Sequence, residues 1–112
     1  NLKRGTTDIY DKVVYEAKYL GYTSITVPNS PYCVVESIDE DSYGRRFAHI
    51  NRLSDGSKGV FRCSKVWYNE YGLEQGQLIK AIFDKKPKKI QNEKGKWVNS
   101  KTDFYWELSA WS

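Results

Sequence analysis

Short stretches of alternating apolar and polar residues, separated by tight turns, constrain this chain more than any other feature. Five stretches have the period of two and the β-branched or aromatic content of strands: residues 32–38, 45–53, 59–64, 77–83 and 104–111. Asp55-Gly56 lies between the second and third stretches and is a strong hairpin signal. Because turns this short can only reverse the chain, we expect antiparallel strands.

Two helices are expected where apolar residues recur at helical spacing. In residues 8–20 they are Tyr10, Val13, Val14 and Ala17, with Asp8 as a fair N-cap and Gly21 as the stop. In residues 66–71 they are Trp67, Tyr68 and Tyr71, and Gly72 closes the helix. Prolines at 28 and 31 mark a linker. We therefore divide the chain into an N-terminal helix and linker, residues 1–31, and a β domain, residues 32–112.

The aliphatic content is low for a domain of 112 residues. Hydrophobic residues make up 39% of the chain, nine of them are tyrosines, and the 15% of aromatic residues must supply much of the packing. A sheet that closes on itself suits a small core, and five strands with a helix between the third and fourth are typical of the OB-fold. We expect a mainly β protein: a five-stranded OB-fold Greek-key barrel with an N-terminal helix and a short helix, carrying Trp67 and Tyr71, that plugs one end.

The residues that would support catalysis or metal binding are missing from the pattern. Cys33 and Cys63 lack CxxC spacing and lie in apolar stretches, which favours two buried thiols over a bridge. The acidic turn at 39–41 has too few acids for a calcium loop. There is no zinc spacing, nucleophile elbow or phosphate-binding glycine loop. We expect no cofactor, no metal and no active site in this domain.

The ends of the chain and its hydropathy bear on its location. The N-terminal sequence lacks a signal-peptide pattern, and no stretch approaches the ~18 apolar residues that a membrane span needs. We expect a cytoplasmic module with no membrane partner, monomeric as an isolated domain. Because the chain begins at Asn1 rather than Met, we expect it to be excised from a longer protein.

Positive charge is gathered in two windows. Residues 85–101 hold seven lysines and one acid, Glu93, and residues 45–65 hold six basic residues and one acid, Asp55. Because the whole chain carries only +4, the remaining residues carry −7. The first window is centred on Asn92-Glu93-Lys94-Gly95, a turn sequence that can form a hairpin. Two basic windows on an otherwise acidic chain favour an acidic partner, of which nucleic acid is the commonest.

The second and third expected strands carry a family resemblance. Residues 46–56 read RFAHINRLSDG, an alternating strand that ends in Leu-x-Asp before a glycine-containing turn. Residues 59–63 read GVFRC and lead into the aromatic helix, which YGLEQGQLI at 71–79 links to the fourth strand. This pattern, over about residues 32–84, resembles the nucleic-acid-binding OB modules of aminoacyl-tRNA synthetases and of bacterial DNA polymerase III alpha subunits.

A second segment narrows the resemblance. Residues 16–24 read EAKYLGYTS, an acidic residue followed by a Leu-Gly-aromatic-x-Ser stretch directly upstream of the OB pattern. It is similar to the helix end that precedes the OB domain in C-family replicative polymerases of bacteria and phages. The resemblance implies a module that guides single-stranded template near the active site, with the other domains of the parent polymerase as partners. It also implies that those domains carry out the polymerase reaction.

Single-stranded nucleic acid needs cations along its phosphates and flat side chains on which its bases can stack. An OB barrel offers strands two and three and the loops between strands one and two and between four and five. On strand two, Phe47, His49 and Asn51 would share the outward face, while Ala48 and Ile50 would face inward. The candidate binding residues are Tyr43, Arg45, Arg46, Phe47, His49, Asn51, Arg52, Arg62, Lys85, Lys86, Lys88, Lys89, Lys94, Lys96 and Trp97.

Some alternatives stay open at this stage. A register slip of one residue would place Phe47 in the core, and Trp97 either folds back onto the protein or stacks on a ligand. DNA is expected as the ligand, with RNA left open. The same groove could instead take an acidic peptide or a replisome partner, or serve as a tRNA-anticodon-type OB module.

Overall fold

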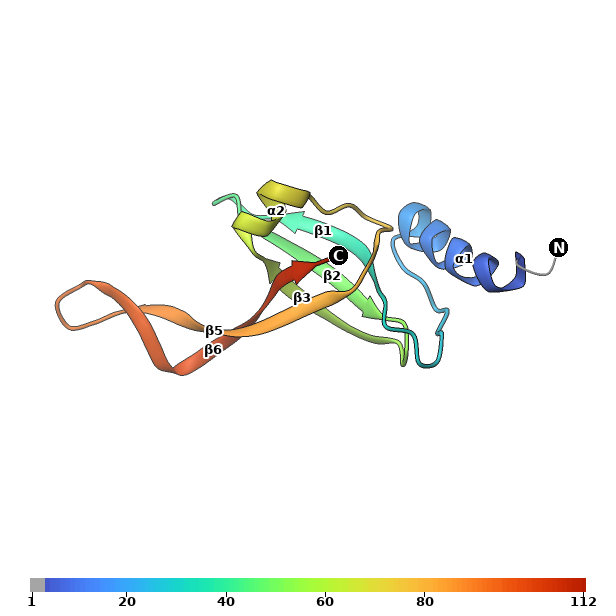
Figure 1. Cartoon of the computed structure of the whole chain (residues 1–112). Coiled ribbons are helices and arrows are strands. Elements are labelled where there is room, and N and C mark those ends of the chain that lie inside the picture. Colours follow the sequence, from blue (N-terminus) through green and yellow to red (C-terminus); the bar gives the residue numbers. More distant parts are fainter. Residues whose placement is uncertain (1–3) are drawn as a thin grey trace.

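One curled sheet of six strands organises the protein. A computed structural model describes residues 4–112, with side chains from Ile9 onward. The elements are α1 (Arg4–Leu20), β1 (Cys33–Glu40), β2 (Arg46–Arg52), β3 (Ser57–Cys63), α2 (Lys65–Tyr71), β4 (Leu78–Ile79), β5 (Ala81–Gln91) and β6 (Trp97–Trp111). The prediction of a mainly β protein with one helix before the sheet and one within it is confirmed (Figure 1).

The strand order in the sheet is β4-β1-β2-β3-β6-β5. The pairs are antiparallel except β3 and β6, which run parallel. Only Lys80 separates β4 from β5, and its N–H and C=O bond to Ser112 while Ile79 pairs with Cys33 of β1. The continuous segment 78–91 therefore supplies both edge strands, β4 and β5, so the sheet curls into a half-barrel. Five strands were expected, and the structure has six because the expected 77–83 strand is interrupted where it passes from β1 to β6.

The inner face of the sheet holds the main core. Its buried residues are Cys33, Val35, Ala48, Ile50, Cys63, Leu73, Ile79, Leu108 and Trp111. Trp67 of α2 packs against this cluster, and its indole N–H donates to the carbonyl of Trp111 at 3.0 Å. The indole N–H of Trp111 donates to the Gly72 carbonyl at 2.9 Å. Trp67 thus plugs the core as expected, but Tyr71 does not: it is exposed and stacks on the Trp67 ring.

Both cysteines lie in this core as free thiols, as the sequence predicted. Burial raises the pKa of Cys33, and it raises the pKa of Cys63 to about 11. Because the thiolate is the reactive form, both side chains act as small apolar residues at neutral pH.

Helix α1 covers part of the outer face of the sheet. Val13 and Ala17 form a second buried cluster with Val34 and Leu53. The helix ends at Gly21 as expected but begins at Arg4, four residues before the expected Asp8, because the polar residues before Asp8 carry no apolar period that would reveal a helix. Gly76 lets the chain pass close to α1, since a Cβ there would lie 2.8 Å from the Cβ of Lys18.

A buried polar cluster joins the segment after α1 to the sheet. Glu36 accepts hydrogen bonds from the backbone N–H of Thr23 at 2.9 Å and from the side-chain amide of Asn51 at 3.1 Å. The Asn51 amide also donates to the Thr23 carbonyl at 3.0 Å. Asn51 is 1% exposed, so the structure assigns it to the fold and not to a binding surface. The outward face of β2 was expected correctly, but α1 and the following segment cover the end on which Asn51 lies.

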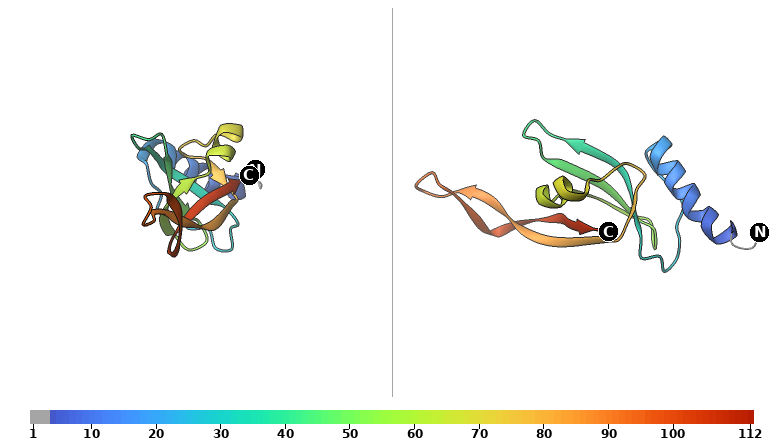
Figure 2. Two further views of the ribbon diagram at one scale, coloured as in Figure 1. Left: turned by 90° about the vertical axis from the view of Figure 1, so that its left-hand side faces the viewer. Right: turned by 45° about the horizontal axis from the view of Figure 1, so that its top comes forward.

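The hairpin of β5 and β6 extends beyond the sheet at the end opposite α1, which gives the molecule its long axis of 67 Å against 26 and 23 Å (Figures 1 and 2). The turn expected at 92–95 closes it, and the Asn92 side chain accepts from the N–H groups of Lys94 and Lys96. Register jumps from Pro87 opposite Phe104 to Lys89 opposite Asn99, so β6 carries extra residues there. A bulge of this kind bends a strand pair.

Replacing Asn51 with alanine tests its assignment to the fold. The change leaves the Thr23 carbonyl and the Glu36 carboxylate short of a buried partner, which costs about 1–3 kcal/mol of unfolding free energy. Urea unfolding measures this, with Asn69→Ala on the exposed side of α2 as the control, expected within about 0.5 kcal/mol of wild type. An Asn51→Ala protein as stable as the control would contradict the assignment.

Candidate nucleic-acid interface

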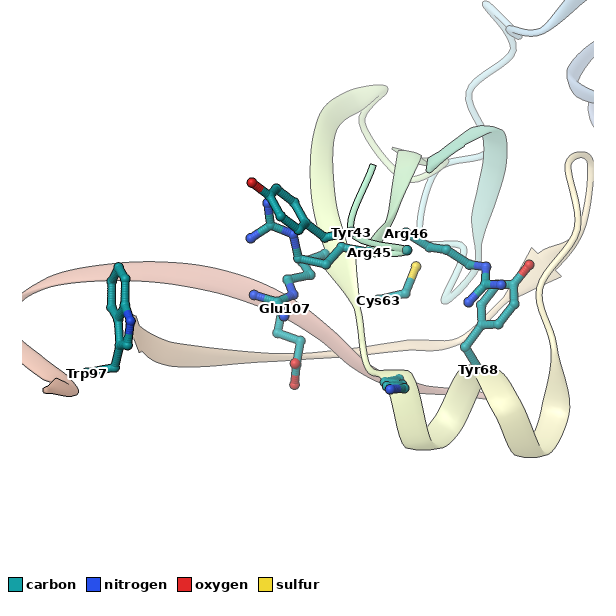
Figure 3. Close-up of a pocket in the computed structure, with 10 residues that line it drawn as sticks. Tyr43, Arg45, Arg46, Cys63, Tyr68, Trp97 and Glu107 are labelled. Carbon is teal, nitrogen blue, oxygen red and sulfur yellow. The ribbon is translucent and has the colours of Figure 1, made fainter. Parts of the chain in front are cut away.

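Two hollows meet beside the root of the hairpin. The first, of about 720 Å³, lies between the β1–β2 loop, α2 and β6. The second, of about 620 Å³, lies between the outer face of β2 and β3 and the hairpin. They share the lining residues Arg45, Arg62 and Trp97, so they lie next to each other, and we name the two hollows together the trough. Figure 3 shows Trp97 on the hairpin at one side of the first hollow and Tyr68 of α2 at the other.

Asp41 orders the β1–β2 loop at the rim of the trough. One of its carboxylate oxygens accepts from the backbone N–H groups of Tyr43 and Arg45, each at 2.9 Å. The other oxygen accepts from Arg45 Nε at 2.6 Å. Gly44 provides the left-handed backbone, with φ 79°, that this tight turn requires. The loop thereby holds the Tyr43 ring, which is 82% exposed, 5.1 Å from the Arg45 guanidinium carbon.

Arg46 links the rim to α2. Its guanidinium carbon lies 4.3 Å from the centroid of the Tyr68 ring, and Figure 3 shows the two side chains stacked. A terminal nitrogen of Arg46 also lies 3.4 Å from Glu40 Oε1. A cation over an aromatic face is attracted by the ring quadrupole, so Tyr68 holds the positive charge of Arg46 at the edge of the trough.

Arg62 lies on β3 in the floor of the trough, directly opposite Phe47 of β2. Its guanidinium carbon is 5.6 Å from the Tyr105 ring of β6. Within the described part of the chain, no carboxylate forms an ion pair with Arg62 within 4.0 Å. Its charge is therefore not neutralised by an ion pair within this part of the protein.

The hairpin supplies the remaining wall. Lys88, Lys89 and Pro87 line the second hollow from β5, and Trp97 lines both hollows from the start of β6. The Trp97 side chain is 66% exposed, so it does not fold back as a packed staple.

The structure brings together eight of the predicted binding residues. Those that line the trough are Tyr43, Arg45, Arg46, Phe47, Arg62, Lys88, Lys89 and Trp97. Phe47 is half-buried on the outer face, opposite Arg62, and is not a core residue.

The other predicted residues lie elsewhere. His49 Nε2 is 2.6 Å from Asp39 Oδ2 on the outer face of the sheet. Arg52 lies at the far end of β2 and is paired with Asp55 at 2.7 Å, which raises the pKa of Arg52 and holds that of Asp55 well below its usual range. The four remaining lysines, on β5 and at the hairpin turn, are outside both hollows: Lys85, Lys86, Lys94 and Lys96.

Among the residues that line the trough, sequence reasoning missed four with charged or aromatic side chains: Lys65, Tyr68, Tyr105 and Glu107. Lys65 was counted only as part of the basic window at 45–65, and Tyr68 only as part of the expected helix at 66–71, although both line the first hollow. For Tyr105 and Glu107 the strand period was a usable signal, because alternation puts both on the face opposite the buried Leu108.

Comparison with protein-family models, with curated proteins and with solved structures gives no match for this chain. Among the described residues, neither helix has the length and apolar content needed to cross a membrane. Residues 9–112, whose side chains are described, hold no group of three or more His, Cys, Asp or Glu side chains arranged to bind a metal ion.

The titration of Asp41 tests how the loop is held. Burial alone would raise its pKa, but hydrogen bonds from the Arg45 backbone and guanidinium and from the Tyr43 N–H hold the pKa below its ordinary value of 3.8. A carboxyl with a lowered folded-state pKa stabilises the fold above its unfolded pKa, and this stabilisation is lost as pH falls through the folded value. By NMR, we expect the amide signals of Tyr43 and Arg45 to titrate together with a midpoint below 3.8.

The control is Asp41→Asn, in which the side chain has no proton to gain and the shared titration disappears. A midpoint at or above 3.8, or amides that titrate separately, would contradict the account of the loop.

Proposed function

We propose that this chain is an OB-type module that binds single-stranded DNA through the trough. The observation that carries the proposal is the convergence of unneutralised cations and exposed aromatic rings in one depression. Arg62, Lys88 and Lys89 supply the charge, while Tyr43 and Trp97 supply flat faces. A single strand needs both on one continuous track.

The connectivity of the sheet supports the OB-type assignment. When β4 and β5 are counted as one strand interrupted at Lys80, five strands remain, with a helix between the third and the fourth. The last strand then lies between the third and the fourth, and the fourth returns to pair with the first. A five-stranded, partly open Greek-key barrel binds ligands on strands two and three and on the loops beside them, which is where the trough lies.

The arrangement of the rings favours a single strand over a duplex. In a duplex the bases already stack on one another, so exposed rings such as Trp97 gain little from contact with it. Stacking of an unpaired base on an aromatic ring is worth about 1–3 kcal/mol, which exceeds the worth of a typical exposed ion pair.

We also propose that the parent chain is a C-family polymerase alpha subunit. Support comes from the segment at 16–24, whose sequence resembles the helix end that precedes the OB domain there. Glu16 in α1 accepts a hydrogen bond from the Thr23 hydroxyl at 2.8 Å, which ties this helix end to the segment that runs to the sheet. In such a parent chain, this module would bind the template, and the other domains would catalyse the polymerase reaction.

A titration with labelled oligothymidine, followed by fluorescence anisotropy at two salt concentrations, tests the binding function. We expect binding whose log K falls linearly with log salt, by about 0.7 per phosphate neutralised, with quenching of tryptophan fluorescence. A duplex of equal length should bind more weakly. Failure to bind any oligonucleotide would favour a protein-interaction barrel, and a clear preference for a tRNA stem-loop would favour an anticodon-type module.

Replacing Trp97 with alanine tests the stacking. We expect affinity for oligothymidine to fall by about 1–3 kcal/mol, roughly 5–150-fold, with the thermal unfolding temperature unchanged. Trp106→Ala is the matched control, because Trp106 lies on the same strand and is 55% exposed but lines a separate hollow beside Ile50 and Phe61. Equal losses in the two variants would remove Trp97 from the binding surface.

A further inference from the structure

Glu107 is the one acid among the residues that line the first hollow, and no part of the binding function described so far uses it. It lies on β6 directly opposite Arg62 of β3 in the parallel ladder. Figure 3 shows its carboxylate directed to the side opposite Tyr43 and Arg45, while Trp97 and Tyr68 line the two ends of the same hollow. An acid in this position repels phosphate, so it weakens the electrostatic attraction on which the rest of the trough relies.

The Glu107 carboxylate is not neutralised by its surroundings. Within the described part of the chain, no Lys, Arg or His forms an ion pair with it within 4.0 Å. Arg62, its neighbour in the ladder, lies against the Tyr105 ring instead. Glu107 Oε1 accepts from the Ser109 hydroxyl at 3.0 Å, which orients the side chain, and no hydrogen bond to the second oxygen is present in the described chain.

A negatively charged, oriented acceptor in a nucleic-acid groove can be satisfied only by hydrogen-bond donors, and on DNA these are on the bases. Charge-assisted hydrogen bonds to a carboxylate are about twice as strong as neutral ones. A base that offers more donors to Glu107 should therefore bind more tightly. Guanine presents two adjacent donors, N1–H and the N2 amino group. Thymine presents one N–H between two carbonyl oxygens, and both oxygens are repelled by a carboxylate.

The groups around Glu107 fit the rest of a guanine. Guanine also carries the N7 and O6 acceptors that an arginine fork recognises, and Arg62 stands beside Glu107 with its charge unneutralised. The rings of Tyr68 and Trp97 flank the same hollow and offer faces for stacking. Donor, acceptor and stacking groups thus surround one space.

We propose that Glu107 makes the trough selective, so that guanine is preferred over thymine at the nucleotide next to it. This inference rests on the proposed binding of single-stranded DNA and adds a base-reading residue to it. Glu107 contacts the base edge, while the surrounding cations hold the phosphates whatever the sequence.

Three oligonucleotides of equal length test the proposal: all-thymidine, alternating guanine and thymine, and the same alternation with hypoxanthine replacing guanine. Hypoxanthine keeps N7, O6 and N1–H but lacks the N2 amino group. We expect the guanine strand to bind at least about fivefold more tightly than oligothymidine, the low end of the discrimination that a good base contact gives. The hypoxanthine strand should lose most of that gain.

Glu107→Gln then assigns the preference to this side chain. We expect the variant to bind oligothymidine at least as tightly as wild type, because a negative charge is removed from the trough, and to lose the preference for guanine. Glu93→Gln is the matched control: it removes the same charge from the exposed hairpin turn and should keep the wild-type preference.

The outcomes separate this inference from the function on which it rests. Equal wild-type affinities for guanine and thymine strands, or a preference that survives Glu107→Gln, would overturn the role of Glu107 while leaving single-strand binding intact. Loss of affinity for every oligonucleotide in Glu107→Gln would show a structural role and would also overturn it. Absence of wild-type binding to all three strands would overturn the proposed function itself.

Discussion

The parallel pairing of β3 with β6 is the contact on which the rest of the structure depends. It consists of the register pairs Arg62 with Glu107 and Cys63 with Leu108, extended by the bond from the Ser64 N–H to the Leu108 carbonyl at 3.0 Å. This short ladder joins the antiparallel strands β1 to β3 to the C-terminal hairpin. Together with the pairing of β4 with β1 and the Trp111 bond to Gly72, it fixes the place of the hairpin beside the β1–β2 loop.

The same pairing completes the core. Leu108 is fully buried and Cys63 nearly so, and Trp111 at the end of β6 bonds to the turn that follows α2. Full burial of a leucine stabilises a fold by about 1.5–3 kcal/mol. Burial of Leu108, the neighbour of Glu107, therefore helps to hold β6 in place. Because side chains alternate along β6, Leu108 faces the core while Glu107 faces the trough.

The outer face of the sheet is divided between packing and exposure. Toward one end, α1 packs on Val34 and Leu53, and Thr23 of the following segment bonds to Asn51. Toward the other, Phe47 and Arg62 remain accessible next to the hairpin. The aromatic residues that compensate for the small aliphatic core follow the same division: Trp67 and Trp111 pack, whereas Tyr43 and Trp97 stay exposed.

Local signals in the sequence predicted the two helices, the turn at 92–95 and most strand segments, because period, turn residues and helix stops act over a few residues. They missed that β5 continues to Gln91 and that β6 starts at Trp97, since the basic residues there lack an apolar alternation. They also placed Ala48 and Ile50 inward and Phe47 outward. What they could not show is which element covers an outward face. Asn51 shares a face with Phe47, yet it is buried and bonded to Thr23 of the segment after α1 and to Glu36 of β1, contacts that lie far apart in the sequence.

Charge windows were a coarser guide than strand direction. Arg45 and Arg52 belong to the same window, but β2 carries them to opposite ends of the sheet, and Asp55 pairs with Arg52 after the turn. Lys89 and Lys94 differ in the same way, because Lys89 lines the second hollow whereas Lys94 lies in the turn of the hairpin and lines neither. Tyr68 and Lys65 came into the trough through the orientation of α2, which follows from the seating of Trp67 on the core.

The most direct test of the account is a map of the DNA-binding surface by NMR, in which oligothymidine is added to the isotope-labelled chain. The account expects the largest shifts at the backbone amides of Arg45 and Arg62 and at the indole N–H of Trp97, with little change at Arg52, Lys94 or the indole N–H of Trp106. Shifts centred on Arg52 and Trp106, or spread evenly over the lysines of the hairpin turn, would show that the trough is not where a single strand binds.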